Sequence, residues 1–434
     1  MKMGRVSGAV PRAVIVICDS LRADLITPET APFLSELRQR AAFFAAHRSV
    51  FPSTTRASAA SIATGCRPAR HGLLGNTMAL DEGEGLVCRS AGAPDFRDRM
   101  RRATGRTLHV PTLAERLRWH GEDSVSCANV SPGAAYFQDP DGYGWVHHSA
   151  GSFGPGGVPI EDPASAGLTK GIAGDRTMTE RFCGDVLEDR APSLAILWLS
   201  EPDYTGHHAP LGSPQHLAAI ASADGLVKQV FDTVRRLDPS GEDILFATGS
   251  DHGMETVADA IDLTELLVAA GLKESRESRE LVVAPNGTAA TLYFADPEGE
   301  LVSRVARFLS GKNWVGELFF GERLAAAGLP TDTPMRVAVS LAGEDRANPH
   351  GIRGYAPIVQ DPSDNESKIG FGQHGGIGPN EQRPFLIVEG GGFAAGIRQQ
   401  PSSLVDIAPT VLRHLHMDHD DMDGRALPRD LSER

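Results

Sequence analysis

The sequence predicts an α/β fold in which a mainly parallel β-sheet lies between two layers of helices. Short apolar runs of four to six residues, rich in β-branched side chains, alternate with longer segments of helical periodicity. Because continuous apolar runs are typical of strands buried on both faces, helices are expected on both sides of the sheet. The 434 residues are 41% hydrophobic and 23% charged, enough apolar material for a large core.

The predicted elements follow one another along the whole chain. The strands are expected at Ala13–Cys18, Leu194–Leu199, Ile244–Ala247 and Phe385–Val388. The helices are expected at Ala31–Ala46, Thr55–Thr64, Thr112–His120, His216–Leu237 and Leu404–Leu415. Ser149–Pro159 is rich in glycine and proline and is expected to be a loop over the site or across the surface. His414, His416 and His419 are expected on a solvated helix end.

An inserted region divides the predicted core into two parts. The stretch from Glu255 to Lys368 separates two strong motifs and has its own short αβ pattern, which includes Ala290–Phe294 and Glu300–Leu309. We therefore expect residues 1–254 to form the first part of the core, residues 255–368 an inserted cap subdomain, and residues 369–434 the last part of the core.

Charge, apolar stretches and cysteine content narrow the binding partners and the cellular compartment expected for the protein. The net charge of −14 argues against binding to a nucleic-acid polymer or an anionic membrane. No apolar stretch is long enough to span a bilayer, and none that would mark a signal peptide follows Lys2 and Arg5. The five cysteines are odd in number and irregularly spaced, which fits reduced thiols in a cytoplasmic protein. The sequence carries no signal for an oligomeric state.

Polar side chains follow three of the predicted strands. Asp19 follows the first strand, Glu201 and Asp203 follow the second, and Asp251 and His252 follow the third. Ligands of open α/β sheets lie beyond the carboxyl ends of the strands, so these residues point to one site. For any single one of them, a turn or helix cap is the commoner role.

The same residue types suit a metal centre. Asp203 and His207 stand four residues apart in EPDYTGHH and can face one cation, and His374 lies between glycines in GQHGG. Adjacent Asp251 and His252 can converge on a cation at a strand end. A lone histidine is more often a satisfied polar residue than a ligand, but these motifs occur together at predicted strand ends.

A threonine at a helix start supplies a candidate nucleophile. In the segment VFPSTTRASAASIATGCRPARHGLLGN, Pro52 ends the preceding stretch and Thr55 opens an Ala- and Ser-rich helix. A hydroxyl there lies where free backbone N–H groups and the helix dipole favour an anion such as a phosphoryl group. The alternative is that Thr54 or Thr55 only caps the helix.

Taken in order, these motifs resemble the alkaline phosphatase superfamily, and most closely its nucleotide pyrophosphatase/phosphodiesterase branch. The resemblance rests on Asp19, Thr55 followed by TGCRPARHG, EPDYTGHH, SDHGM and QHGG, and it spans residues 10–415 apart from the cap. It implies an alkaline phosphatase-like three-layer core with an inserted α+β cap. It also implies a phosphoesterase that hydrolyses phosphodiester or phosphomonoester bonds of small substrates, nucleotides or organophosphates, through a covalent phosphothreonine intermediate.

The resemblance further implies two divalent metal ions, expected to be zinc, with manganese or iron as alternatives. One ion would be held by Asp203, His207 and His374. The other would be held by Asp19, Asp251 and His252, with the Thr55 oxygen as a further ligand.

Spacing within the family motif selects the nucleophile. The family's nucleophile lies nine residues before the threonine of the T-G pair, here Thr64, which gives Thr55 rather than Thr54. An asparagine twenty-one residues after the nucleophile binds the substrate phosphate in the family, and here that position is Asn76. The backbone N–H of Arg56 is expected to join Asn76 in stabilising the phosphoryl oxygens.

Several alternatives stay open. The CRPAR stretch at Cys66–Arg70 matches a sulfatase pattern, but Cys66 lies beyond the helix that such a cysteine should begin. A phosphonoacetate-like hydrolase shares the ligand set, yet RASAA follows Thr55 and no lysine occurs between Lys2 and Lys170. A metal-dependent phosphomutase would carry further basic ligands, and an inactive binding relative would have lost a ligand.

Two features of the sequence bear on the identity of the substrate. Arg56 and Ala57 stand where secreted nucleotide phosphodiesterases commonly have an apolar residue and proline, which weakens the case for a nucleotide. The arginine run Arg97–Arg106 is expected to be a solvated surface; the alternative is an arm that contacts an anionic substrate.

Overall fold

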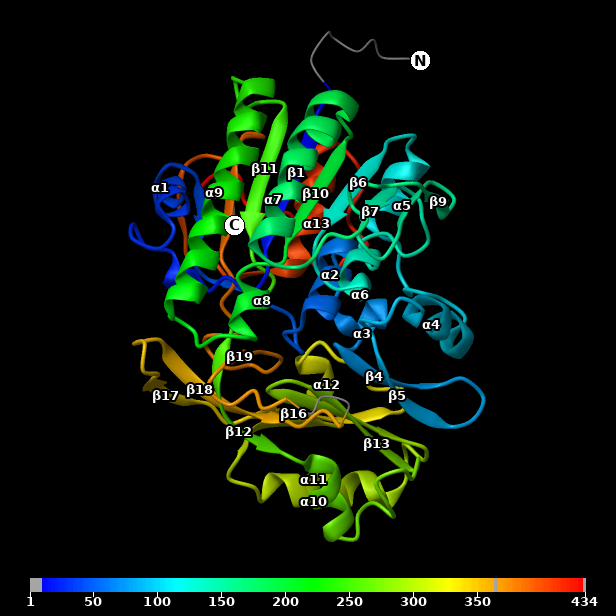
Figure 1. Ribbon diagram of the computed structural model, residues 1–434. Helices are drawn as coiled ribbons and strands as arrows, with labels where there is room; N and C mark the ends of the chain where they lie inside the picture. The colour runs from blue at the N-terminus through cyan, green and yellow to red at the C-terminus, as the bar shows by residue number, and fades with distance from the viewer. Residues whose placement is uncertain (1–9, 363–365, 432–434) are drawn as a thin grey trace.

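A ten-stranded sheet forms the centre of the protein (Figure 1). This computed structural model describes residues 10–362 and 366–431, so the stretch with Lys2 and Arg5 lies outside the described residues. The middle of the sheet is parallel and has the order β11-β1-β10-β6. The bounds of these strands are β1 Arg12–Cys18, β6 Ser124–Ala128, β10 Leu194–Leu199 and β11 Ile244–Gly249. The predicted α/β class is confirmed.

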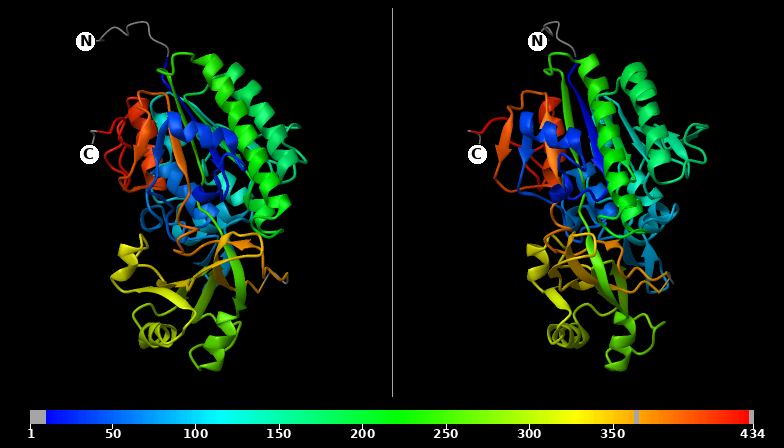
Figure 2. Two further views of the ribbon diagram at one scale, coloured as in Figure 1. Left: turned by 90° about the vertical axis from the view of Figure 1, so that its left-hand side faces the viewer. Right: turned by 60° about the vertical axis from the view of Figure 1, so that its left-hand side comes forward.

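Both faces of the sheet are buried, as the continuous apolar runs predict. Val14 and Val16 of β1 pack into one apolar cluster, whereas Ala13, Ile15 and Ile17 pack into another on the opposite face. Figure 2 shows helices on both sides of the sheet. The first cluster contains side chains of α1 (Pro32–Arg40), α7 (Ile172–Arg181) and α9 (Pro214–Leu237). The second contains side chains of α2 (Thr55–Thr64), α5 (Leu113–Trp119), α6 (Pro132–Tyr136) and α13 (Ile407–His414).

Two sequence predictions about the sheet margins are wrong. The helix expected over Ala31–Ala46 ends at Arg40, and Ala42–Phe44 forms β2, which pairs with β20 (Leu386–Glu389) and β21 (Gly396–Arg398). The segment expected to be a loop at Ser149–Pro159 instead forms most of β8 (Ser152–Gly154) and β9 (Val158–Ile160), which extend the sheet beyond β7 (Trp145–His147). Its glycines supply the tight turn: Gly156 and Gly157 have φ angles of +83° and +67°.

Two four-stranded sheets lie beneath the central sheet in Figure 1. One has the order β13-β14-β16-β15 and packs on α10 and α11 around its own apolar cluster. The other, β17-β18-β12-β19, pairs β12 with a strand that follows residue 368, so it joins the inserted region to the last part of the chain. The bounds are β12 Glu255–Ile261, α10 Leu263–Ala269, β13 Leu281–Asn286, β14 Ala289–Phe294, α11 Glu300–Ser310, β15 Val315–Phe320, β16 Met335–Leu341, β17 Glu344–Ala347, β18 Arg353–Val359 and β19 Gly372–Gln373.

No helix within residues 10–362 and 366–431 combines the length and apolar character that a bilayer crossing requires.

Candidate functional site

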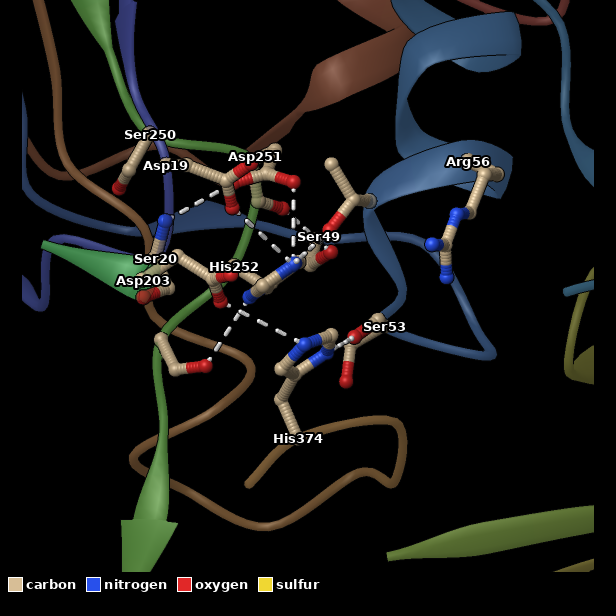
Figure 3. A network of polar contacts seen from close by, with 12 residues as sticks. Asp19, Ser20, Ser49, Ser53, Arg56, Asp203, Ser250, Asp251, His252 and His374 are labelled. Carbon is tan, nitrogen blue, oxygen red and sulfur yellow. Dashed lines mark hydrogen bonds and ion pairs between the residues drawn. The ribbon is translucent and has the colours of Figure 1, made fainter. Parts of the chain in front are cut away.

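The carboxyl ends of three neighbouring strands meet at the predicted site. β1 pairs in parallel with β10 on one side and β11 on the other, so the residues that follow these strands come together. Asp19 follows β1, and Asp203 begins α8 (Asp203–Gly206) just after β10. Asp251 and His252 follow β11, and Figure 3 shows these side chains converging with His374.

The structure gathers the predicted acidic and histidine side chains into two groups of three. In the sealed trio, Asp19, Asp251 and His252, the ligand-type atoms lie within 4.8 Å of one another and all three residues are buried. In the open trio, Asp203, His207 and His374, the same limit holds, but only His374 is fully buried. The rings of His252 and His374 stack at 3.7 Å between centroids and so join the two trios. These sets are the ones expected from the sequence.

Each of the three aspartates has one buried oxygen that receives no hydrogen bond from any described residue other than the histidine it faces. The facing Nε2 atoms lie 3.0 Å away for Asp251 with His252, 3.3 Å for Asp203 with His207 and 3.7 Å for Asp19 with His252. The buried oxygens are Oδ1 of Asp19, Oδ1 of Asp203 and Oδ2 of Asp251. The other oxygen is satisfied in two of them: Trp198 Nε1 donates to Asp19 Oδ2 at 3.1 Å, and the Ser20 N–H donates to Asp251 Oδ1 at 3.1 Å. Burial, and then the charges of Asp251 and Asp203, raise the pKa of Asp19 well above its usual range. A set of buried carboxylate oxygens and histidine nitrogens that face one another fits a divalent cation.

The histidines are oriented for the same role. Nδ1 of each lies beside a backbone carbonyl: His207 at 3.0 Å from Gly372, His252 at 3.1 Å from Gly253 and His374 at 2.8 Å from Ser53. A carbonyl only accepts, so each Nδ1 carries a proton and each Nε2 faces the centre. Burial lowers the pKa of His252, but the charge of Asp251 outweighs it, so the pKa of this ring lies above its usual value. Burial, followed by the neighbouring His252, also lowers the pKa of His374 well below its usual value, which keeps the ring neutral.

The structure separates the two candidate threonines. Thr55 is the first residue of α2, and its Oγ1 lies 3.2 Å from Nε2 of His252 in the sealed trio. Thr54 occupies the N-cap position, yet its side chain makes no capping hydrogen bond, and its buried Oγ1 has no partner among the described residues. The hydroxyl beside the acidic and histidine side chains is therefore that of Thr55.

Asn76 lies next to this helix start. The N–H of Arg56 donates to Oδ1 of Asn76 at 3.2 Å, and both residues line a cleft of about 650 Å³ that also contains His207 and His374. Asn286, at the end of β13, accepts hydrogen bonds from the N–H groups of Asn76 at 2.7 Å and Thr77 at 3.2 Å. The inserted region thus fixes the backbone that carries Asn76.

Sequence reasoning missed Asn286. Its only signal is the Asn-Gly pair with Gly287, which in a strand-rich segment indicates a hairpin turn rather than a contact to a loop over two hundred residues earlier. A larger cavity, of about 870 Å³, opens away from the trios between Phe44, Phe51 and Phe319, and none of the predicted site residues lines it.

The remaining predicted features lie outside the trios. Cys66 is buried just past Gly65, where α2 ends. Arginines of the basic run lie on α4 (Phe96–Thr104) and pair with acids. These ion pairs join Arg99 and Arg102 to Glu82, and Arg101 to Asp98 and Asp141. This arrangement favours the surface interpretation over a substrate arm.

The expectation for His414 is wrong. The ring is buried rather than solvated, and its Nε2 lies 2.9 Å from the Arg12 carbonyl and 3.1 Å from that of Asp243.

Comparisons with known proteins complete the description of the site. Residues 13–312 match the family described as Type I phosphodiesterase / nucleotide pyrophosphatase. Two solved structures of murine ectonucleotide pyrophosphatase/phosphodiesterase 5 share 16% identity with the chain, at TM-scores of 0.67 and 0.66. They cover 97% and 96% of this chain, and 97% of each of theirs is matched; the first is an inactive form in complex with AMP. No curated protein matches significantly. At this identity the structures support the alkaline phosphatase-like fold.

Proposed function

Because the chain belongs to the type I phosphodiesterase/nucleotide pyrophosphatase family, we propose that it is a two-metal phosphoesterase that hydrolyses small phosphorylated substrates through a phosphothreonine at Thr55. The observation that carries the proposal is the position of the Thr55 hydroxyl, 3.2 Å from His252 Nε2 at the start of α2 and beside the sealed trio. A nucleophile, a helix N-terminus and a cluster of carboxylates meet there.

Two sets of side chains would hold the metal ions. Asp19, Asp251, His252 and the Thr55 oxygen would bind one, and Asp203, His207 and His374 the other. The convergence of buried aspartate oxygens and histidine Nε2 atoms on the same two points supports this assignment. Divalent ions such as zinc supply Lewis acidity and lower the pKa of a coordinated hydroxyl group.

The reaction proposed for the chain's own residues has two steps. The Thr55 hydroxyl loses its proton to solvent as its oxygen attacks phosphorus. A bond forms between Oγ1 and phosphorus while the bond from phosphorus to the leaving oxygen breaks on the opposite side, and the leaving group takes up a proton from solvent. Water then cleaves the phosphothreonine, which releases the phosphoryl product and restores the hydroxyl. The free N–H groups at the start of α2 favour the negative charge that gathers on the phosphoryl oxygens.

Asn76 contributes a side-chain donor in this scheme. The Arg56 N–H donates to Asn76 Oδ1, so the Nδ2 group of Asn76 is left to bind a phosphoryl oxygen. The Arg56 N–H then acts by orienting Asn76, a change from the direct contact expected from the sequence. Asn286 holds the same loop through two further hydrogen bonds.

The complete ligand set favours a hydrolase over an inactive relative. Each predicted acid and histidine lies in one of the two trios, and Thr55 reaches the sealed trio. A phosphonate hydrolase uses the same centre, so the substrate decides between the two activities.

The test combines metal analysis with a substrate panel. Purified protein should contain two divalent ions per chain and should hydrolyse bis(4-nitrophenyl) phosphate, 4-nitrophenyl phosphate or both, whereas cleavage of phosphonoacetate alone would favour the phosphonate hydrolase. Chelation should abolish turnover, and zinc or manganese should restore it. Mass spectrometry after an acid quench should find the phosphoryl group on Thr55. Turnover that survives complete metal removal, or a phosphoryl group on another residue, contradicts the proposal.

A further inference from the structure

The guanidinium group of Arg56 is fixed in place but left with open donors. Its Nε donates to Ser131 Oγ at 3.0 Å, at the N-cap of α6. The backbone of Gly92 lies beside the guanidinium, since a Cβ atom built there would be 2.7 Å from Nη2. No described residue accepts a hydrogen bond from Nη1 or Nη2 of Arg56, which lines the same cleft as Asn76. In Figure 3 the side chain leaves the start of α2 on the side away from Asp19.

Lys170 is held at the same edge of the sheet by its two neighbours. The carbonyl of Thr169 accepts a hydrogen bond from Asn129 Nδ2 at 3.1 Å, and the N–H of Gly171 donates to Ser200 Oγ at 2.8 Å. Asn129 follows β6 and Ser200 follows β10, so both anchors lie at the carboxyl ends of strands. Lys170 has no hydrogen bond or ion pair with any residue in the described ranges.

Arg56 and Lys170 are both anchored to the segment that follows β6, because Ser131 accepts a hydrogen bond from Arg56 Nε and Asn129 donates one to the Thr169 carbonyl, next to Lys170. Although the residue as a whole is exposed, protein crowds the ammonium group, and this desolvation lowers the pKa of Lys170. The charge of Arg56 lowers it further, whereas Asp203 and Asp19 raise it. Two like charges with unused donors beside a reactive centre repel each other, and an anion between them relieves that repulsion.

The cleft gives a second indication about the substrate. Its lining contains no phenylalanine, tyrosine or tryptophan among the described residues, and the exposed ring of Tyr204 lies outside this lining, beside Gly171. Asp361, Glu366 and Lys368 line it from the inserted region, where Lys368 is paired with Glu366 at 3.0 Å, so the described part of this wall has one acid in excess, whereas Arg56 lines it from the core. An acidic substituent is therefore attracted to the core wall.

We infer that Arg56 and Lys170 form a subsite for a second anionic group of the substrate, a carboxylate or a further phosphoryl group carried close to the scissile phosphorus. Guanidinium groups bind such groups through two parallel hydrogen bonds, and an ammonium adds a point charge. This inference rests on the proposed phosphoesterase function and deepens it: the preferred substrate carries an acid where a nucleotide carries a neutral nucleoside.

The subsite is tested by binding to the metal-loaded protein, measured by calorimetry with probes that contain no phosphate ester. The probes are methylphosphonate, 3-phosphonopropionate and ethane-1,2-diphosphonate. Wild-type protein should bind at least one of the two doubly anionic probes about tenfold more tightly than methylphosphonate. The comparison between these two probes distinguishes a carboxylate subsite from a phosphoryl subsite.

Substitutions test which residues cause the preference for doubly anionic probes. Arg56→Gln and Lys170→Gln should each remove most of the tenfold preference, and Arg56→Lys should retain part of it. Arg236→Gln and Lys228→Gln, which remove the same charges from exposed positions on α9, should keep it in full. Thermal melting checks that each variant folds. If Arg56→Gln does not fold, the affinities of Lys170→Gln, a substitution at an exposed residue, test the subsite.

The outcomes separate the subsite from the reaction. If wild-type protein binds all three probes equally well, the inferred subsite does not exist. The same conclusion follows if Arg56→Gln and Lys170→Gln both keep the preference for a doubly anionic probe. Neither result depends on which ester the enzyme hydrolyses. Methyl 4-nitrophenyl phosphate, assayed in parallel, carries no second acid. Failure of the wild-type protein to hydrolyse this or any other ester in the panel overturns the proposed function, while the probe affinities still decide the subsite.

Discussion

The two trios differ in what surrounds them and in what holds them. His252 of the sealed trio has no exposed side-chain surface, whereas the side chains of Asp203 and His207 in the open trio are 18% and 23% exposed. Adjacent parallel strands, with Ile17 opposite Gly249, position the sealed trio. The open trio instead joins α8 to a segment that follows the inserted region.

Under the proposed mechanism, this difference gives the two halves of the site different tasks. The sealed trio is placed by strand register, and the Thr55 oxygen lies against it, so it suits the attacking group. The open trio lines the cleft through His207 and His374, so it meets the substrate and the departing group. The geometry of the nucleophile is thus set by the sheet, whereas access is set by the contact between the core and the inserted region.

Replacement of the nucleophile should give the largest effect. Thr55→Ala is expected to lower kcat for a phosphodiester by roughly a thousandfold or more, because the attacking oxygen and a metal ligand are lost together. Thr55→Ser should keep much of the activity, since it supplies the same oxygen. Thr54→Ala should have a small effect, because a cap contributes only about 1 kcal/mol. Turnover and metal content are measured in all three variants, and an active Thr55→Ala with an inactive Thr54→Ala would reverse the assignment.

Removal of one histidine from each trio should show which trio small molecules in solution can reach. His207→Gly and His252→Gly are both expected to lose most of their turnover. Added imidazole should restore activity to His207→Gly, because that ring lines the cleft, and should leave the sealed His252→Gly inactive. Rate against imidazole concentration measures the rescue, and 1-methylpyrazole, a ring of similar size and much weaker basicity, serves as the control. Equal rescue of both variants would show that the two trios are equally open.

A buried histidine outside both trios provides a reference for pH. His71 accepts a hydrogen bond from the Leu73 N–H at Nδ1 and lies 2.9 Å from Ser61 Oγ. Burial, then the charge of His109, lowers the pKa of His71 to about 3. The unfolded chain therefore binds more protons between about pH 6.5 and 3, so the contribution of His71 is present above pH 6.5 and is lost as pH falls.

The free energy of unfolding should accordingly decrease on acidification below pH 6.5. His71→Asn keeps an acceptor for Leu73 but does not titrate, so it should reduce the slope by about one proton. Urea unfolding at a series of pH values measures the slope, with and without metal ions. An unchanged slope would mean that His71 is charged or exposed in the folded protein. The same slope change with and without metal ions would place His71 outside the metal chemistry.

The smallest effect is expected at Cys66. Cys66→Ala should keep turnover within about twofold and cost roughly 1 kcal/mol, because a small buried side chain beyond the end of α2 is shortened. Turnover and the urea midpoint measure the two effects. Loss of activity at unchanged fold and metal content, or formylglycine at this position by mass spectrometry, would favour a sulfatase.

The sequence predicts the candidate site best where polar residues directly follow the strands of the central sheet. Asp19, Asp203 and Asp251 each follow a continuous apolar run, and parallel strands deliver such residues to one edge. The local pattern was misleading at Ala42–Phe44, where an alanine- and phenylalanine-rich segment continues a helical pattern but finds strand partners in β20 and β21. Pairing with residues hundreds of positions away decides such cases, and no local propensity records it.

The surroundings of individual side chains are the second feature that the sequence does not predict. Nothing near Arg56 in the sequence indicates that Ser131 accepts a hydrogen bond from its guanidinium group or that Asn129, two residues earlier, binds the loop that carries Lys170. Likewise, His414 ends an apparently exposed helix, yet it bonds to carbonyls of two strand-leading residues, Arg12 and Asp243. These contacts depend on how layers pack, which sequence periodicity does not specify.

The pairing of β12 with β19 has a consequence for the order in which the protein is made. As the chain leaves the ribosome, every side chain of the sealed trio has emerged by His252, but the open trio waits for His374, after the entire inserted region has been synthesised. A nascent or truncated chain that ends within the insertion therefore contains one complete trio and only two members of the other. Such a fragment has the residues to capture one cation, while the second half of the site is still missing.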